Sequence, residues 1–117
     1  MGGLIVIPNK VLRLAEMYLN RAESNLRLGT VTGDAPLNDV NKIRTRAGLT
    51  ALASVSLAQV LTERRHELTF EGGFFLHDAK RTQQSVGTLA WNSPKLVLPI
   101  PQRELIANPK LVQNSGY

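Results

Sequence analysis

The chain has 117 residues, 43% of them hydrophobic, which suits one domain with a small core. Lys and Arg outnumber Asp and Glu by 14 to 9, and the absence of cysteine excludes disulfides, thiolate metal sites and cysteine catalysis. The opening MGGLIVIPNK lacks the basic region and cleavage site of a secretory signal, and no apolar run reaches the roughly 20 residues that span a bilayer.

Residues 1–9 are predicted to form an irregular leader, followed by a helix over residues 10–28. Gly29 suits the left-handed backbone of a helix C-cap. The small side chains of Ala15 and Ala22 allow a second helix to approach closely. The apolar residues of this helix recur at three- and four-residue steps and form one stripe: Leu12, Ala15, Leu19, Ala22 and Leu26.

A second helix is predicted to begin near Pro36, whose fixed φ suits a first helical turn, and to end before Gly48. The loop of residues 30–35 is short enough to force an antiparallel pair of helices. The side chains expected to face inward are Leu37, Val40, Ile43 and Ala47.

A third helix has the best-marked start, because Ser56 and Gln59 have the spacing of a capping box. It is predicted to run to about Phe70 and to stop at Gly72 and Gly73. A short fourth helix is predicted over residues 74–81.

Prolines at positions 94, 99, 101 and 109 exclude a long helix after Thr82. An extended segment is predicted over residues 95–100 and one helical turn over residues 101–106. The sequence therefore predicts an all-α fold, with a helical scaffold over residues 10–81 and an irregular, Pro-rich tail over residues 82–117 that packs on the helices. The tail residues expected to make this packing are Trp91, Leu96, Leu98, Ile100 and Leu111.

Two polar pairs were weighed as sites of chemistry. Glu63 and His66 have the Glu-x-x-His spacing of di-iron bundles, but such sites need a second pair, so a solvated helix face is favoured. His77 and Asp78 are adjacent on a helix and point about 100° apart, so they are interpreted as a cap or a local salt bridge. We therefore assign no catalytic, cofactor-binding or metal-ligating residue and predict that the protein is not an enzyme.

Arg64 lies on the same helical stripe as Leu57, Leu61 and Leu68, where a cation needs a carboxylate or must reach solvent. A partly buried ion pair between Arg64 and Glu71 is predicted to fix the turn after the third helix. An arginine that contacts carbohydrate is the alternative.

Trp91 is the weak candidate for ligand binding, because a sugar ring can pack its C–H groups on a flat aromatic face. Only 5% of the chain is aromatic, so an anchoring role in the tail is the favoured interpretation.

Four segments resemble the SusD/RagB family of outer-membrane nutrient-binding lipoproteins, in the family's order. They are VLRLAEMYLNRAE at residues 11–23, LNDVNKIRTRAGL at residues 37–49, ERRHELTFEG at residues 63–72, and the closing LPIPQRELIANPKLVQNSGY. Together they span about residues 11–117, so the chain resembles the C-terminal portion of a larger family member.

The resemblance implies a tetratricopeptide-like helical hairpin plus a third helix, with no cofactor. It also implies a protein that binds glycans or other nutrients at the cell outer membrane, facing outward, and partners a TonB-dependent transporter of the SusC type. The membrane anchor would be an N-terminal lipid on a part of the protein that this chain lacks, so the chain alone is expected to be soluble. No ligand-binding residue is transferred from the family.

Two other functions compete with this one. A stand-alone helical-hairpin adaptor would bind a protein or peptide in its groove. A basic nucleic-acid-binding domain is disfavoured, because the cations alternate with acidic residues, as in ERRHE, and form no long block.

Overall fold

A computed structural model describes residues 12–117, so the predicted leader over residues 1–9 lies outside the described part of the chain. The described residues contain five α-helices, one 3-10 turn and no strand, which confirms the all-α prediction. They divide into two compact units, an N-terminal unit that ends at Thr69 and a C-terminal unit over Phe70–Tyr117.

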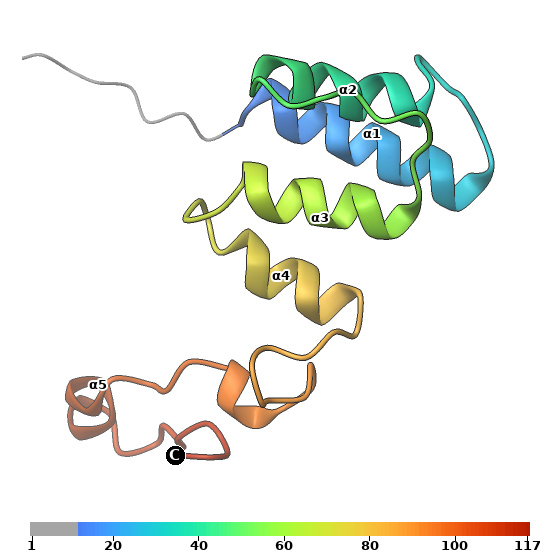
Figure 1. The fold of residues 1–117 in the computed structure, drawn as a ribbon. Helices are drawn as coiled ribbons and strands as arrows, with labels where there is room; N and C mark the ends of the chain where they lie inside the picture. Colours follow the sequence, from blue (N-terminus) through green and yellow to red (C-terminus); the bar gives the residue numbers. More distant parts are fainter. Residues whose placement is uncertain (1–11) are drawn as a thin grey trace, which may run out of the picture. The chain divides into compact units, whose positions relative to one another are not determined.

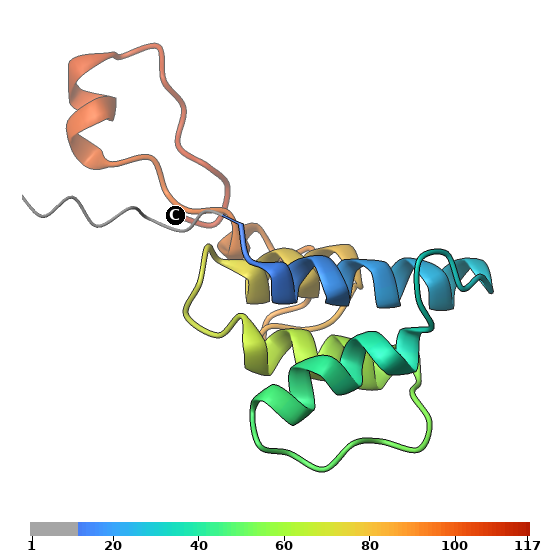
Figure 2. The same cartoon turned by 90° about the horizontal axis from the view of Figure 1, so that it is seen from above.

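The N-terminal unit contains α1 (Leu14–Leu28), α2 (Pro36–Arg46) and α3 (Leu57–Glu67). Figure 1 shows α1 and α2 as an antiparallel pair, with α3 running in the same direction as α2. This direction requires the loop of residues 47–56 to return along the length of the unit, as seen in Figure 2. α1 packs against both other helices.

The predicted boundaries hold for α2 and for the end of α1, whereas α1 begins at Leu14 and not at residue 10. Gly29 caps α1 with a φ of 65°, and Pro36 opens α2. The capping box of α3 is also confirmed. The backbone N–H of Gln59 donates to the Ser56 hydroxyl, and the backbone N–H of Ser56 donates to the side-chain oxygen Oε1 of Gln59. These capping residues act within one helical turn, so the helix ends that they mark can be predicted from the sequence.

The third helix was predicted about three residues too long, since it ends at Glu67 and not near Phe70. The Thr69 hydroxyl donates to the carbonyl of Arg65, a side-chain bond that competes with continued helix. Phe70 then adopts a left-handed φ of 65°. The chain therefore turns before the two glycines.

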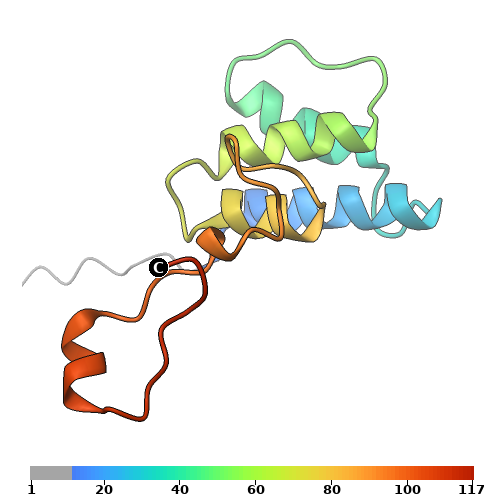
Figure 3. The ribbon, with the colours of Figure 1, turned by 90° about the horizontal axis from the view of Figure 1, so that it is seen from below.

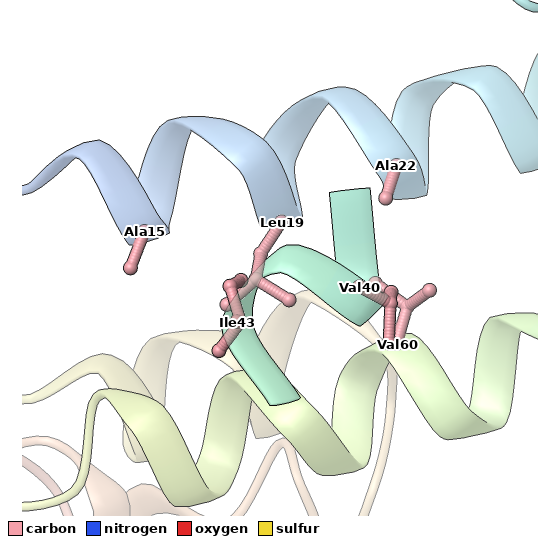
Figure 4. Packing of buried hydrophobic residues seen from close by; sticks show 6 residues of the cluster. All are labelled: Ala15, Leu19, Ala22, Val40, Ile43 and Val60. Carbon is pink, nitrogen blue, oxygen red and sulfur yellow. The ribbon is translucent and has the colours of Figure 1, made fainter. Parts of the chain in front are cut away.

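The core of the N-terminal unit joins all three helices (Figure 4). Figure 4 shows Leu19 pointing from α1 toward α2 and α3, whose Val40, Ile43 and Val60 belong to the same buried cluster. Leu12, predicted on the inward stripe of the first helix, is instead 72% exposed. The buried apolar cluster is Ala15, Leu19, Ala22, Val40, Ile43 and Val60.

Two amide side chains hold the loops of this unit. Asn25, 3% exposed, donates to the carbonyls of Thr32 and Asp34 and so closes the α1–α2 turn. Asn41 makes a two-way bond with Leu52, donating to its carbonyl at 3.0 Å and accepting from its N–H at 2.8 Å. Both loops are therefore fixed by hydrogen bonds that replace backbone partners.

The C-terminal unit contains α4 (Phe74–Arg81), a 3-10 turn η1 (Pro94–Leu96) and α5 (Gln102–Ala107). After α5 the tail returns to η1, as Figure 3 shows, and the Tyr117 hydroxyl donates to the Lys95 carbonyl at 3.1 Å. Gln113 makes a two-way bond with the backbone of Ile100. Leu96 is buried, whereas Leu98 is 79% exposed, against the expectation that it packs.

Candidate functional site

The charged residues of the N-terminal unit join its helices to one another. Glu67, near the end of α3, accepts hydrogen bonds from Arg13 before α1 and, at 2.6 Å, from Arg46 at the end of α2. Arg13 also donates to the Glu67 carbonyl at 3.2 Å. One carboxylate therefore ties three segments of the chain together.

A second set of polar contacts lies one turn earlier on α3. Glu63 forms an ion pair with Arg44 of α2, and Arg44 also donates to the Thr50 carbonyl. The Arg64 guanidinium donates to the Asn20 side chain of α1 at 2.5 Å. Adjacent residues of α3 therefore reach two different helices.

The third set surrounds Tyr18 on α1. Arg21 donates to both carboxylate oxygens of Asp39 at 2.8 and 2.6 Å, a two-point geometry typical of strong pairs. Lys42 donates to Asp34 at 2.6 Å. The Arg21 and Lys42 cations lie over the Tyr18 ring, 5.7 and 5.1 Å from its centroid.

The Asp34 carboxylate is held in its ionised form. The Lys42 ammonium is the largest cause, followed by hydrogen bonds from the Asn38 side chain and the Ala35 N–H, and together they hold the pKa of Asp34 well below its usual range. The reciprocal bond to Asp34 raises the pKa of Lys42.

In each of these ion pairs the carboxylate side chain is less exposed than the side chain of its cation. The Asp39 side chain is 0% exposed against 36% for Arg21, and the Glu67 side chain is 11% exposed against 56% for Arg46. The same order holds for Asp34 and Lys42. The surface above these pairs therefore presents positive charge.

A small hollow and a larger groove are among the hollows in the described part of the N-terminal unit. A small one of about 110 Å³ lies between α1 and α2, and we call it the α1–α2 hollow; its lining is Leu14, Ala15, Tyr18, Lys42, Ile43 and Arg46. A larger one of about 410 Å³, the α3 groove, lies beside the return loop; its lining is Arg44, Leu49, Leu52, Gln59, Thr62, Glu63 and His66.

The structure places the predicted site residues in different parts of the chain. Arg64 is buried, at 4% exposure, in the N-terminal unit. Its proposed partner Glu71 belongs to the C-terminal unit, so the Arg64–Glu71 ion pair stays a prediction. Trp91 is 37% exposed, in a turn of the C-terminal unit, and its ligand role also stays a prediction.

The two polar pairs weighed from the sequence also have defined surroundings. Glu63 is buried and paired with Arg44, which corrects the expectation of a solvated face, while His66 is exposed at the α3 groove. Asp78 pairs with Arg81 of its own helix at 2.7 Å. Within residues 12–117, no three acidic or histidine side chains gather closely enough to hold a metal ion.

Sequence reasoning missed the buried acids, although their positions carried a signal. Asp39 falls between Pro36 and Ile43 on the buried stripe of α2, and Glu63 follows Val60 by three residues on α3. A charge on a buried stripe requires a partner. The cations that supply it come from helices distant in sequence.

The comparisons with known proteins fit this scaffold. The model of the SusD family matches residues 7–93. The chain belongs to the SusD family. Among curated proteins, none matches this SusD-family chain.

Solved structures also resemble the chain, and two of them are SusD-like proteins with known sources. Surface glycan-binding protein A from Bacteroides uniformis is 38% identical, with a TM-score of 0.68, and the match covers 87% of this chain and 26% of that one. A SusD superfamily protein from Parabacteroides distasonis is 27% identical, with a TM-score of 0.70, over 92% of this chain and 27% of that one. This SusD-family chain therefore spans about a quarter of the length of the structures it matches. In the part of it that the structure describes, no helix is both long and apolar enough to cross a bilayer.

Proposed function

We propose that the chain is the C-terminal scaffold portion of a cell-surface protein that binds glycans or other nutrients and partners a TonB-dependent outer-membrane transporter of the SusC type. The protein binds its ligand and does not catalyse a reaction. The observation that carries the proposal is the 38% identity to a surface glycan-binding protein over 87% of the chain.

The scaffold role is supported by how the family-like segments use their charges. The cations Arg13, Arg44 and Arg46 of the first two segments pair with Glu63 and Glu67 of the third. Arg44 and the two carboxylates are largely buried in these pairs, so they have little capacity left for a ligand. The proposal therefore places the glycan contacts outside these pairs.

The first test is the size and location of the native protein. An antibody against residues 99–117 would recover the protein from its source cells, and its intact mass, N-terminal residues and lipid content would be measured. We expect a much larger, lipid-modified species in the outer membrane that co-purifies with a transporter. A lipid-free species that begins at Met1 would overturn the proposal.

A second candidate is a stand-alone helical-hairpin adaptor that binds a peptide. The α3 groove favours it, because about 410 Å³ lies within the range of ligand sites and combines Leu49 and Leu52 with polar side chains. The adaptor predicts the small Met1 species and a peptide bound at this groove.

Trp91 is our proposed aromatic contact in this portion of the protein. In the native-length protein, Trp91→Ala is expected to weaken retention in gels that contain the cognate polysaccharide, because a flat ring is lost, while Trp91→Phe retains the stacking surface. Electrophoretic mobility with and without polysaccharide measures the effect. Equal retention of wild type and Trp91→Ala would remove Trp91 as a contact.

A further inference from the structure

The α1–α2 hollow combines an apolar lining with a cationic rim. Leu14, Ala15 and Ile43 supply its apolar lining, and the exposed cations Lys42 and Arg46, which we call its rim, line it as well. At about 110 Å³ it has room for one medium-sized apolar side chain. It lies outside the proposed glycan contact and shares one residue, Arg46, with the ion pairs between α2 and α3.

The rim is positive because of how its ion pairs are arranged. Lys42 and Arg46 are 46% and 56% exposed, whereas their carboxylate partners are more buried: Asp34 and Asp39 beside Lys42 are 24% and 0% exposed, and Glu67 beside Arg46 is 11% exposed. An approaching anion therefore meets cations first.

The wall of the hollow argues against a sugar as its occupant. Arg21 and Lys42 both lie over the Tyr18 ring, which occupies ring surface that a pyranose would need. A protein segment needs only a pocket for one apolar side chain and a cation within reach of a neighbouring carboxylate.

We propose that the α1–α2 hollow is a docking site for an acidic segment of a partner protein. An apolar side chain of that segment enters between Leu14 and Ile43, and adjacent Asp or Glu carboxylates contact Arg46 and Lys42. The charge complementarity of this surface, in a chain of net charge +5, selects an acidic occupant.

The test uses the full chain, labelled with ¹⁵N, and three blocked peptides. The probe is Glu-Glu-Leu-Glu-Glu, with Gln-Gln-Leu-Gln-Gln as the charge control and Glu-Glu-Ala-Glu-Glu as the anchor control. We expect amide shift changes centred on Tyr18, Ile43 and Arg46 with the probe, and weaker binding of both controls. No binding of the probe, shift changes elsewhere, or equal binding of the charge control would overturn the proposal.

A variant pair separates local contact from overall charge. Arg46→Gln is expected to weaken binding of the probe by about threefold, the usual size of one exposed ion pair, while Arg46→Lys retains most of it. Arg103→Gln is the matched control, because Arg103 is an exposed cation of the C-terminal unit whose side chain is 88% exposed. Equal weakening by Arg46→Gln and Arg103→Gln would show attraction by net charge only, and would overturn the site.

An acidic glycan is a further outcome of the same titration. Shift changes at Tyr18 and Arg46 with an oligogalacturonate, and none with the peptide, would contradict a protein partner. The titration measures neither transporter association nor glycan retention, so a failure here leaves the proposed function standing.

Discussion

The Asp39 carboxylate is fully buried and bonded at both oxygens by Arg21, whose own side chain is partly exposed. If the carboxylate is removed, the Arg21 guanidinium can turn toward water. The loss of folding stability is therefore smaller than for a fully buried ion pair. The residue nevertheless fixes how α2 lies on α1. Asp39 is therefore a structural residue, although a buried acid of this kind resembles an active-site carboxylate.

Asp39→Ala is expected to lower the free energy of unfolding by about 1–3 kcal/mol, because buried hydrogen bonds to a charged group are lost. Urea unfolding followed by circular dichroism measures the change. Glu104→Ala is the control, because Glu104 is 48% exposed and pairs with its neighbour Arg103, and we expect an effect within about 0.5 kcal/mol. Equal effects would contradict the anchoring role of Asp39.

Asp34 gives the N-terminal unit a dependence on acid. Its pKa in the folded chain lies below the usual 3.8, so its bonds stabilise the fold above that value and are lost as the pH falls through the lower folded pKa. Lys42→Met is expected to raise the pKa of Asp34, because the largest cause of the shift is removed. Side-chain carbon NMR during acid titration measures it, and an unchanged pKa would refute Lys42 as the cause.

At the scale of elements, the starts of α2 and α3 could be predicted, whereas the start of α1 and the end of α3 could not. The capping box at Ser56 and the proline at Pro36 act on their own first turns, so the sequence states them directly. The end of α3 depends on the Thr69 hydroxyl and on a left-handed Phe70, which no apolar period encodes. The end of α3 was therefore missed because side-chain competition governs it.

Ser56→Ala is expected to cost about 1 kcal/mol, because an amide N–H in the first turn of α3 loses its acceptor. Thermal unfolding of the full chain measures the change. Ser54→Ala, at an exposed position of the same loop, is the matched control. A Ser56→Ala chain as stable as the control would show that the capping box contributes little.

At the scale of the molecule, the candidate site was harder to predict than the fold. Apolar periods identified Leu19, Val40 and Ile43 correctly, because one helix face is readable from one segment. The pairing of Glu67 with Arg13 and Arg46 joins three segments, and such contacts follow only from the packing. The predicted boundary between scaffold and tail at residue 82 stays a proposal. The boundary between the two compact units lies between Thr69 and Phe70 in the sequence.

The two units predict separate responses to a core mutation. Leu19→Ala is expected to destabilise the N-terminal unit by about 2–5 kcal/mol, because a fully buried side chain is deleted. Trp91 is the single tryptophan, so its fluorescence reports on unfolding of the C-terminal unit. We expect the unfolding midpoint measured by fluorescence to stay the same, while the midpoint measured by the circular dichroism of the helices falls. A joint shift of both signals would show that the units unfold as one.

The shared carboxylate of Glu67 also bears on how the chain is made. Synthesis proceeds from the N-terminus, so Arg13 leaves the ribosome 54 residues before the acid that receives it. The hairpin of α1 and α2 can close through Asp39 at once, but both guanidinium groups that end on Glu67 must wait in water for α3. A nascent chain arrested before Glu67 would contain the α1–α2 hairpin without the ion pairs to that residue. Its uncovered apolar side chains would then be accessible to chaperones.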